Sequence, residues 1–373
     1  MSKSFEIGKT SLSKGRRRVL AAASVLPGAA VSSKALCETI AARFDIKTSI
    51  YARLLAPKLG VAHRHLCRDF HAAHEAPRPG HRNPELAALA VQKALNQAGI
   101  EANDLGYLIS HTTTPSQLLP PGSFEVAQLL KFAGPHMELR QACTGFANAL
   151  QIAFAMTASA DAAPIAIVGS ETGSVYFSPE VLRGDQSQWV NFLQMGDGAA
   201  AIIIAPDSPA SVKPETHLGY ISSAYFGQCQ NPPASGLRLL VGGSDHTDHQ
   251  PDHPILFEHD FKSVAEHGAY LLEAGRAILA QQGYAVEDAQ FLIPHQASGA
   301  LAAWLAQRWN VPEESISHHA NQVGNLGSAS IWAAFVDFVE TTQEIERRSQ
   351  QPVLVFGAEA TQYSYGGFVF EFA

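Results

Sequence analysis

Three residues spread along this sequence could together carry acyl-transfer chemistry, and the first of them is a cysteine. Cys143 lies in the segment RQACTGF, after a short predicted strand at 138–139 and before a predicted helix of small and apolar residues at 145–160. A thiol at a helix N-terminus meets unpaired N–H groups and the positive end of the helix dipole, which favour the reactive thiolate. We therefore predict that Cys143 is a nucleophile. The plainer alternative, a buried cysteine acting as a small apolar side chain, is what we expect for the other three: Cys37, Cys67 and Cys229.

His295 and Asn325 lie far along the chain from Cys143, and both have side chains that can assist an acylated thiol. His295 stands directly after a predicted apolar strand at 290–293, and Asn325 lies in a loop of small residues that opens a predicted helix at 329–344. A neutral imidazole can hydrogen-bond a thioester oxygen or move a proton, and a carboxamide can donate to an oxyanion without becoming charged. Taken singly, such a histidine is more often structural and such an asparagine more often a turn or cap residue. Their pairing with a nucleophilic cysteine predicts one catalytic site.

The elements that must bring these residues together alternate between strands and helices along the chain. The apolar pattern and the turn signals predict strands at 18–26, 105–110, 138–139, 163–169, 198–205, 218–224, 290–293, 315–318, 353–356 and 367–372. The same signals predict helices at 33–43, with Ser33 as a cap, and at 84–98, 124–132, 145–160, 263–281, 299–309 and 329–344.

Turn formers at 206–214 divide this α/β pattern into two halves. The N-terminal half, 1–210, carries the cysteine, and the C-terminal half, 211–373, carries the histidine and the asparagine. A polar, irregular stretch at 228–254 is expected to be an insertion or a loop over the site. Two related, βαβ-rich halves packed face to face are the natural interpretation.

Composition argues against several other classes of protein. The 373 residues are 46% apolar and 16% charged, as in an ordinary globular protein, and the net charge of −8 argues against a nucleic-acid binder. No apolar run approaches the roughly 20 residues of a membrane span, and the run at 19–26 is too short for a convincing signal peptide. The cysteine spacing matches no zinc module or disulfide scaffold, so we expect a cytoplasmic protein with reduced thiols. Histidines and aspartates gather at 245–259, where we expect a solvated loop rather than a metal site.

In this order along the chain, the motifs resemble those of the ketoacyl-acyl-carrier-protein synthase III enzymes, which are thiolase-like condensing enzymes. The resemblance rests on the Cys143 segment, on PHQA at 294–297, on GNLGSAS at 324–330 and on GDGAA at 196–200. It implies a thiolase-like fold with five layers, α/β/α/β/α, a homodimer, and a triad of Cys143, His295 and Asn325. It also implies no bound cofactor, since the substrates are acyl thioesters carried on the phosphopantetheine of coenzyme A or of an acyl carrier protein.

The same resemblance indicates which residues contact the substrate. The segment TTTPSQLLPP at 112–121 is similar to that of ketosynthases that form dialkylresorcinol, stilbene or pyrone precursors. Within it, Leu118 and Leu119 would line an acyl tunnel near the dimer interface, with ordinary core packing as the alternative. Apolar side chains at these positions favour a medium or long acyl chain. The expected substrate-binding residues are completed by Phe146, Ser298 and Gly327.

Three departures from the family pattern argue against a synthase that starts fatty-acid synthesis from acetyl-CoA. Leu54 and Lys58 occupy places where primer-CoA synthases usually carry Trp and Arg. Ser298 and Ala300 stand where family members often have Asn and Arg. The turn at 356–367, which shapes the oxyanion site in the family, is longer here and poorer in glycine. These departures indicate a specialised role with a carrier-bound or unusual acyl donor.

The sequence therefore predicts a ketosynthase with two half-reactions. Cys143 would accept an acyl group, and a malonyl- or β-ketoacyl-type thioester would then supply a carbon nucleophile, formed by decarboxylation or by α-deprotonation. One alternative is an acyltransferase that passes the acyl group to oxygen or nitrogen, and another is a non-catalytic subunit of a heterodimer. Asn325 favours the ketosynthase, because family acyltransferases often replace it, and the intact triad argues against the non-catalytic subunit.

Overall fold

The chain folds around one long mixed sheet. The computed structural model describes residues 7–46, 50–71, 80–207, 217–232, 235–239, 255–258, 261–342 and 351–373. Within these ranges the sheet has nine strands, in the order β11 (Phe291–Pro294), β12 (Val353–Glu359), β13 (Ser364–Phe372), β8 (Gly219–Cys229), β1 (Ile7–Val25), β7 (Gly198–Pro206), β6 (Ile165–Glu171), β4 (Tyr107–His111) and β5 (His136–Leu139). Two short antiparallel pairs lie apart from it: β2 (Val31–Ser32) with β3 (His63–Arg64), and β9 (Gly236–Leu239) with β10 (Ile255–Glu258).

The long strand β1 joins the two parts of this sheet. Its beginning and middle pair antiparallel with β8, from Ile7 opposite Cys229 to Val19 opposite Gly219. Its end pairs antiparallel with β7, over residues 17–25. β4 runs parallel to both β5 and β6, and β11 runs parallel to β12. Because parallel neighbours end at the same edge of a sheet, residues that follow these strands gather on one side of the molecule.

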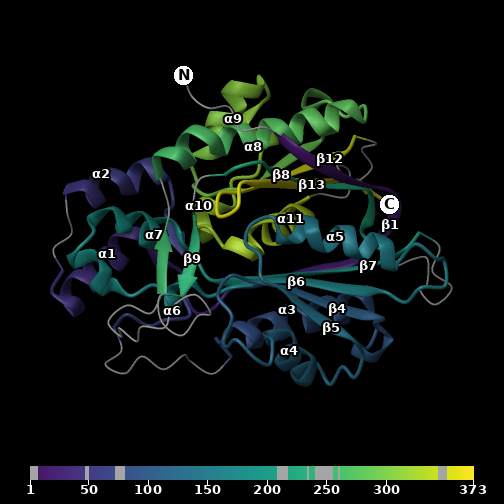
Figure 1. Ribbon diagram of the computed structural model, residues 1–373, viewed down its shortest axis with the longest axis horizontal. Coiled ribbons are helices and arrows are strands. Elements are labelled where there is room, and N and C mark those ends of the chain that lie inside the picture. The colour runs from purple at the N-terminus through teal and green to yellow at the C-terminus, as the bar shows by residue number, and fades with distance from the viewer. Residues whose placement is uncertain are drawn as a thin grey trace.

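Helices cover both outer faces of the sheet and fill the space between its two parts (Figure 1). The outer helices are α3 (Asn83–Ala98) and α4 (Gly122–Leu130) on one side and α8 (Phe261–Gln281) and α9 (Leu301–Trp309) on the other. The central helices are α5 (Gly145–Met156) and α11 (Ser330–Thr341), and each contacts strands of both parts. The order helix, sheet, helix, sheet, helix is the five-layered arrangement expected from the motifs.

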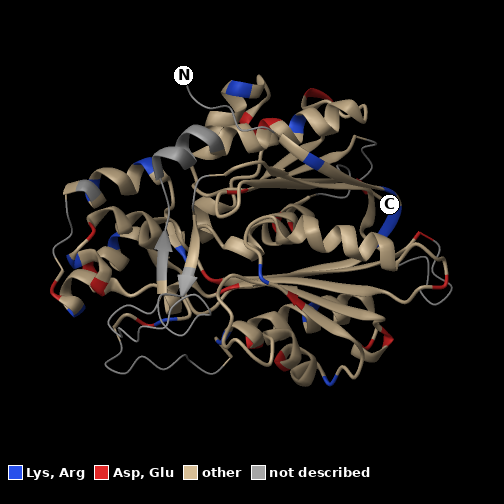
Figure 2. Cartoon of the chain, viewed as in Figure 1, with Lys and Arg blue, Asp and Glu red and all other residues tan. Residues whose placement is uncertain are grey.

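The central helix α5 is largely apolar because most of its residues are buried between the two parts of the sheet. It carries no charged residue, whereas each of the outer helices carries at least one (Figure 2). Phe146 packs edge-on against Trp332 of α11 and against Phe368 of β13, with ring centroids 5.5 and 6.1 Å apart. A helix this apolar is stable in a globular protein only where most of it is buried, so this packing fixes the direction in which α5 presents its N-terminus.

A lobe of short helices closes one end of the layers (Figure 1). It contains α1 (Ser33–Phe44), α2 (Ile50–Leu59), α6 (Gly173–Tyr176) and α7 (Trp189–Gln194). It has its own apolar core, in which Leu36 and Ile40 pack with Trp189 and Phe192. α10 (Ala320–Val323) connects to the lobe through β3. The polar stretch 228–254 is described only in part, and its described flank Gly236–Leu239 forms the β9–β10 hairpin.

Differences from the predicted elements have local causes. β1 begins at Ile7 rather than at residue 18, because its polar first half pairs with β8 instead of burying an apolar face. α1 is capped by Ser32 rather than Ser33, since the Ser32 side chain accepts a hydrogen bond from the N–H of Ala35 at 3.1 Å. The predicted strand at 315–318 is reduced to one bridge between residues 316 and 292. The predicted boundary after residue 210 lies outside the described residues.

Candidate active site

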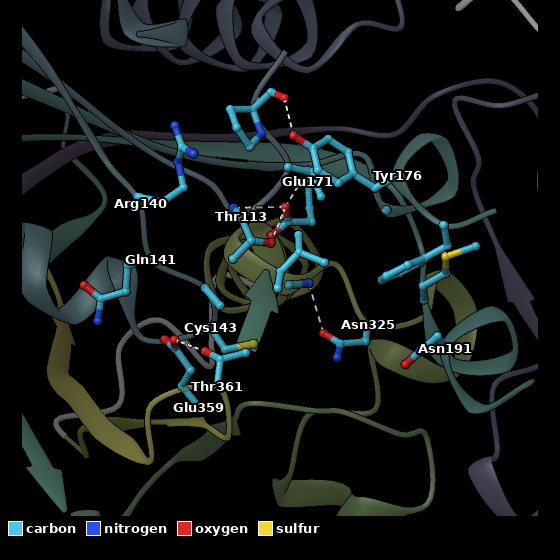
Figure 3. A pocket seen from close by; sticks show the side chains of 18 of the residues that line it. Thr113, Arg140, Gln141, Cys143, Glu171, Tyr176, Asn191, Asn325, Glu359 and Thr361 are labelled. Atoms are coloured by element: carbon cyan, nitrogen blue, oxygen red, sulfur yellow. Dashed lines mark hydrogen bonds between the residues drawn. The ribbon is translucent and has the colours of Figure 1, made fainter. Parts of the chain in front are cut away.

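A cavity of about 390 Å³ opens where the parallel strands end (Figure 3). Its walls come from the segment after β4, the last residues of β6 and β12, the turn before α5 and the loop before α11. The lobe and the β9–β10 hairpin close the remaining sides through apolar and polar residues that include Tyr176, Phe177, Asn191, Met195, Leu237 and Ile255. This mixed lining suits a ligand with an apolar chain and a polar reacting end.

Cys143 lines this cavity from the turn before α5 (Figure 3). Its thiol is free, and the residue is half-buried. The turn comes close to β4, because a Cβ on Gly145 would lie 2.6 Å from Nδ1 of His111. The absence of a side chain at Gly145 therefore lets the first turn of α5 approach the sheet and hold the sulfur at the cavity wall.

The charges around Cys143 differ from those expected at a helix N-terminus. Burial raises the pKa of the Cys143 thiol well above its ordinary value of 9.0, and the carboxylates of Glu359 and Glu171 raise this pKa further, against a smaller lowering by a backbone hydrogen bond. The N–H of Thr144 at the start of α5 donates to Oε2 of Glu359, at 3.0 Å. The helix terminus thus already serves a carboxylate. Burial and these carboxylates therefore oppose the thiolate that the sequence predicts at this helix terminus.

Asn325 enters the same cavity from the loop between α10 and α11 (Figure 3). Gly324 has a φ of +74°, and a Cβ there would lie 2.9 Å from the carbonyl oxygen of Gln194. The N–H of Asn325 donates to that same carbonyl at 2.6 Å. Its Oδ1 accepts hydrogen bonds from the N–H of Gly327 at 2.9 Å and from the hydroxyl of Ser330 at 3.1 Å. Because Oδ1 is occupied, the orientation of the amide is fixed and its NH₂ group is left to donate to a ligand.

His295 lies directly after β11, beside the carboxyl end of β12. Its N–H donates to the carbonyl of Phe356 at 2.6 Å. Its side chain is buried, and Nδ1 has no hydrogen-bond partner among the described residues. Burial lowers the pKa of the imidazole to about 4, so the ring is neutral at physiological pH. His295 is not among the residues that line the cavity, so the structure brings Cys143 and Asn325 to one surface and places His295 outside that lining, next to β12.

Glu171, which the sequence did not single out, ends β6 and lines the cavity (Figure 3). Its buried side chain accepts hydrogen bonds from both halves of the chain. Oε2 accepts from the N–H and the hydroxyl of Ser328, at 3.0 and 2.8 Å. Oε1 accepts from the N–H of Thr113 at 3.1 Å and from the hydroxyls of Thr112, Thr113 and Thr114 at 3.3, 2.8 and 2.5 Å. Glu171 thus ties the loop after β4 to the start of α11.

Glu359 is a second buried carboxylate at the cavity, where it ends β12 (Figure 3). Its side chain is 2% exposed. Oε2 accepts hydrogen bonds from the N–H and the hydroxyl of Thr144, at 3.0 and 2.7 Å, and Oε1 accepts from the hydroxyl of Thr361. A carboxylate at this end of α5 also complements the helix dipole. The sequence signal that could have identified Glu359 is its position just after the predicted strand 353–356. The sequence analysis considered this turn only for its length and its low glycine content.

The five predicted substrate-binding residues are placed differently. Leu118 and Gly327 line the cavity. Leu119 is 83% exposed and is not among the lining residues. Ser298 is half-buried in the loop after β11 and does not line the cavity. Phe146 is fully buried between Trp332 and Phe368, so the structure places it in the core instead of at the cavity.

Two further expectations concern the segment rich in histidine and aspartate and the absence of membrane spans. The histidines and aspartates at 245–254 and residue 259 lie outside the described residues, so the solvated loop expected there stays a prediction. Among the helices in the described ranges, none combines the length and the apolar character needed to cross a membrane.

Protein-family models match a segment of each half of the chain. Residues 137–219 match the model described as 3-oxoacyl-[acyl-carrier-protein (ACP)] synthase III, and residues 279–372 match the model of the C-terminal part of these enzymes. The first range contains Cys143, and the second contains His295 and Asn325.

Individual relatives of this chain are also β-ketoacyl-[acyl-carrier-protein] synthase III enzymes. The β-ketoacyl-[acyl-carrier-protein] synthase III of Xanthomonas oryzae pv. oryzae is 27% identical over 297 residues, which are 76% of this chain and 80% of that protein. The enzyme of the same name from Chlamydia pneumoniae is 27% identical over 258 residues, or 69% of this chain and 73% of that protein.

Solved structures share the fold. A tetronic acid condensing enzyme, AbyA1, matches with a TM-score of 0.79 and 21% identity, over 95% of this chain and 99% of that one. The 3-oxoacyl-(acyl carrier protein) synthase III of Pseudomonas aeruginosa PAO1 matches with a TM-score of 0.72 and 22% identity, over 96% and 98%. The predicted thiolase-like fold is confirmed by these matches.

Proposed function

Because models of the 3-oxoacyl-[acyl-carrier-protein] synthase III family match segments in both halves of the chain, we propose that it is a ketosynthase of this family that joins two thioester-bound acyl groups in a Claisen-type condensation. One observation carries the proposal beyond family membership. The Cys143 thiol and the fixed amide of Asn325 line the same cavity, although they come from different halves of the chain. A nucleophile beside an oriented donor is the minimum that covalent acyl transfer through an oxyanion needs.

In the first half-reaction, the sulfur of Cys143 attacks the carbonyl carbon of an acyl thioester. The carrier thiol leaves with the proton that the cysteine loses, and the acyl group stays on Cys143. Apolar lining residues such as Leu118 and Met195 hold the acyl chain. We infer that the carrier is the phosphopantetheine of coenzyme A or of an acyl carrier protein; the name of the related enzymes mentions an acyl carrier protein.

In the second half-reaction, a second thioester provides a carbon nucleophile. The NH₂ group of Asn325 donates to the enolate oxygen of that thioester. The neutral imidazole of His295 does not line the cavity, so completing the predicted triad requires it to reach the same oxygen when substrate is bound. The enolate carbon attacks the acyl carbon on Cys143, and the thiol is released. A specialised role fits the likeness to a priming β-ketosynthase of a polyketide pathway, which has a TM-score of 0.75 and 23% identity.

Intact-protein mass spectrometry tests the proposed function directly. We expect the purified protein to gain the mass of one octanoyl group when it is incubated with octanoyl-N-acetylcysteamine, and Cys143→Ala to gain none. The matched control is Cys37→Ala, which removes another free and half-buried thiol and should keep the adduct. An adduct on Cys143→Ala would contradict the role of Cys143. The absence of any adduct on the wild type, across thioesters of several chain lengths, would contradict the ketosynthase itself.

A further inference from the structure

The described part of the cavity carries more negative than positive charge. Glu171 and Glu359 both line it, and the cation among the described lining residues is Arg140. Arg140 is already paired with Glu138, since its guanidinium lies 2.9 Å from the carboxylate. A malonyl-type second substrate would bring another carboxylate into this space. Like charges in a poorly solvated site repel by several kcal/mol, so this cavity disfavours a substrate that reacts by losing a carboxylate.

The two buried acids are not equivalent. A carboxylate has about four positions at which it accepts hydrogen bonds. Glu171 accepts from six donors, which occupy all of these positions and come from Ser328 and three consecutive threonines. It is fully committed to holding the two halves together. Glu171 is therefore a structural carboxylate, even though it borders the cavity.

Glu359 keeps one acceptor position on Oε1 unused by the described residues. Its three donors are the N–H and the hydroxyl of Thr144, both on Oε2, and the hydroxyl of Thr361 on Oε1. Gln141 donates to the same threonine hydroxyl at 3.0 Å, and Ser364 contacts it at 2.7 Å, so this hydroxyl is held in place. The carboxylate is thus rigid, and Figure 3 shows it beside Cys143. A helix cap alone would not need the carboxylate to face the cavity.

The position of Glu359 matches what the second half-reaction requires. A carbon–carbon bond forms on the acyl carbon that Cys143 carries, and reacting atoms must approach to about 3–3.5 Å before they react. The α-carbon of the second thioester must therefore come next to the sulfur, where Glu359 lies. Carboxylates in poorly solvated sites serve as bases that remove protons next to a carbonyl group.

From this arrangement we propose that Glu359 is the base that removes an α-proton from the second thioester, and that the enzyme condenses its substrates without decarboxylation. The inference rests on the proposed function and adds the class of the second substrate: a thioester with a hydrogen on its α-carbon and no carboxylate to lose. Glu359 is then a catalytic residue, and the family triad supplies the acyl carrier and the enolate donors.

The step balances without any further reactant. The α-carbon–hydrogen bond breaks, its proton goes to Glu359, and its electron pair moves onto the thioester oxygen, to which Asn325 donates. The enolate carbon then forms a bond to the acyl carbon, and the carbon–sulfur bond to Cys143 breaks. The proton held by Glu359 passes to the released thiolate, which restores the thiol and the carboxylate. The raised pKa of the Cys143 thiol favours this return of the proton.

Hydrogen–deuterium exchange tests the base separately from acylation. Octanoyl-N-acetylcysteamine is incubated in D₂O with the Cys143→Ala variant, which cannot be acylated there, and deuterium at the α-carbon is measured by mass spectrometry. We expect enzyme-dependent exchange, and a loss of at least about 100-fold when Glu359→Gln is added, as for removal of a general base. Glu359→Asp should restore part of the exchange. Glu371→Gln on the neighbouring strand, which does not line the cavity, is the matched control.

Condensation assays give an independent outcome. The wild type is offered octanoyl-N-acetylcysteamine together with malonyl-N-acetylcysteamine, and released CO₂ is measured against condensed product. We expect product without CO₂. Rapid CO₂ release coupled to product would overturn the proposal, and so would a Glu359→Gln variant that exchanges α-protons as fast as its parent. If that variant does not fold, as judged by its melting temperature, the CO₂ measurement decides alone. If Cys143 is acylated and condensation releases CO₂, the role of Glu359 is refuted and the ketosynthase activity is retained. If Cys143 is not acylated, the ketosynthase activity itself is refuted.

Discussion

Replacing Asn325 by aspartate would remove one donor and leave the surrounding loop intact. The aspartate keeps an oxygen at the position of Oδ1, which accepts from Gly327 and Ser330 at 2.9 and 3.1 Å. It lacks the NH₂ group, which is the part of the amide left for the enolate oxygen. Loss of one such donor typically raises a barrier by about 2.7–4 kcal/mol, or about 10²–10³ in rate. The added negative charge opposes the enolate, so this range is the minimum that we expect for condensation.

Two half-reactions measured separately would show whether the amide acts where we infer. Acyl-enzyme formation is followed by quenched-flow mass spectrometry, and condensation is followed from the pre-acylated enzyme. We expect condensation to fall at least about 100-fold and acylation to fall much less. Asn96→Asp, on the exposed face of α3, is the matched control, because its side chain bonds only to Gln92 among the contacts described. An equal loss in both half-reactions would refute the assignment of Asn325 to the enolate.

A comparison of Asn325→Ala with Asn325→Asp separates the loss of activity from the loss of stability. Asn325→Ala removes the donor and also both hydrogen bonds that Oδ1 accepts, each worth about 1 kcal/mol. We therefore expect a lower melting temperature for Asn325→Ala than for Asn325→Asp, with a comparable loss of condensation. If the two variants melted at the same temperature, the contacts to Gly327 and Ser330 would not be holding the loop.

The remaining predictions follow from other parts of the site and core. Leu118→Trp should shift the preference for acyl chains to shorter ones, because Leu118 lines the cavity. Leu119→Trp, at an 83% exposed position, should leave the chain-length profile unchanged. An unchanged profile in both variants would show that Leu118 does not contact the acyl chain. Iodoacetamide should alkylate Cys143 slowly at neutral pH and faster as the pH rises above 9.0. Glu359→Gln should move this pH profile of alkylation to lower pH, because the substitution removes a carboxylate that raises the pKa of the thiol. A profile that did not move would contradict the electrostatic coupling between Glu359 and Cys143. Phe146→Ala should cost about 3–5 kcal/mol of unfolding free energy in denaturant titrations, because Phe146 is fully buried; a loss below about 1 kcal/mol would contradict its place in the core.

The sequence predicted individual helices and strands because their signals were local, whereas the five-layered fold was implied by the resemblance to a known family. α3 and α8 end or begin close to the predicted residues, since each has a clear apolar face and turn formers at its ends. The polar beginning of β1 could not be predicted, because it is a strand only through pairing with β8, more than two hundred residues away. α7 was missed for a similar reason: its six residues form a helix where Trp189 is fully buried against α1 and α2, and no local signal records that packing.

The candidate site was predicted in part. Cys143 and Asn325 were found because small residues flank them and elements start beside them, and the structure places both at one cavity. Glu171 and Glu359 were missed, because an acidic residue at the end of a strand is usually solvated. What buries them is contributed by distant segments, such as Ser328 for Glu171 and Thr144 for Glu359. Charge inside a cavity is therefore a property of the assembled chain.

The shared strand β1 has a consequence for attempts to take this protein apart. A gene cut between residues 207 and 217 would leave β1 on the first fragment, although β8 at the start of the second fragment needs it as a neighbour from Ile7 to Val19. The second fragment alone would expose an unpaired sheet edge, which is prone to aggregation. The two pieces should regain a folded form only when they are produced together, so the cysteine and the asparagine cannot be studied on separately folding parts.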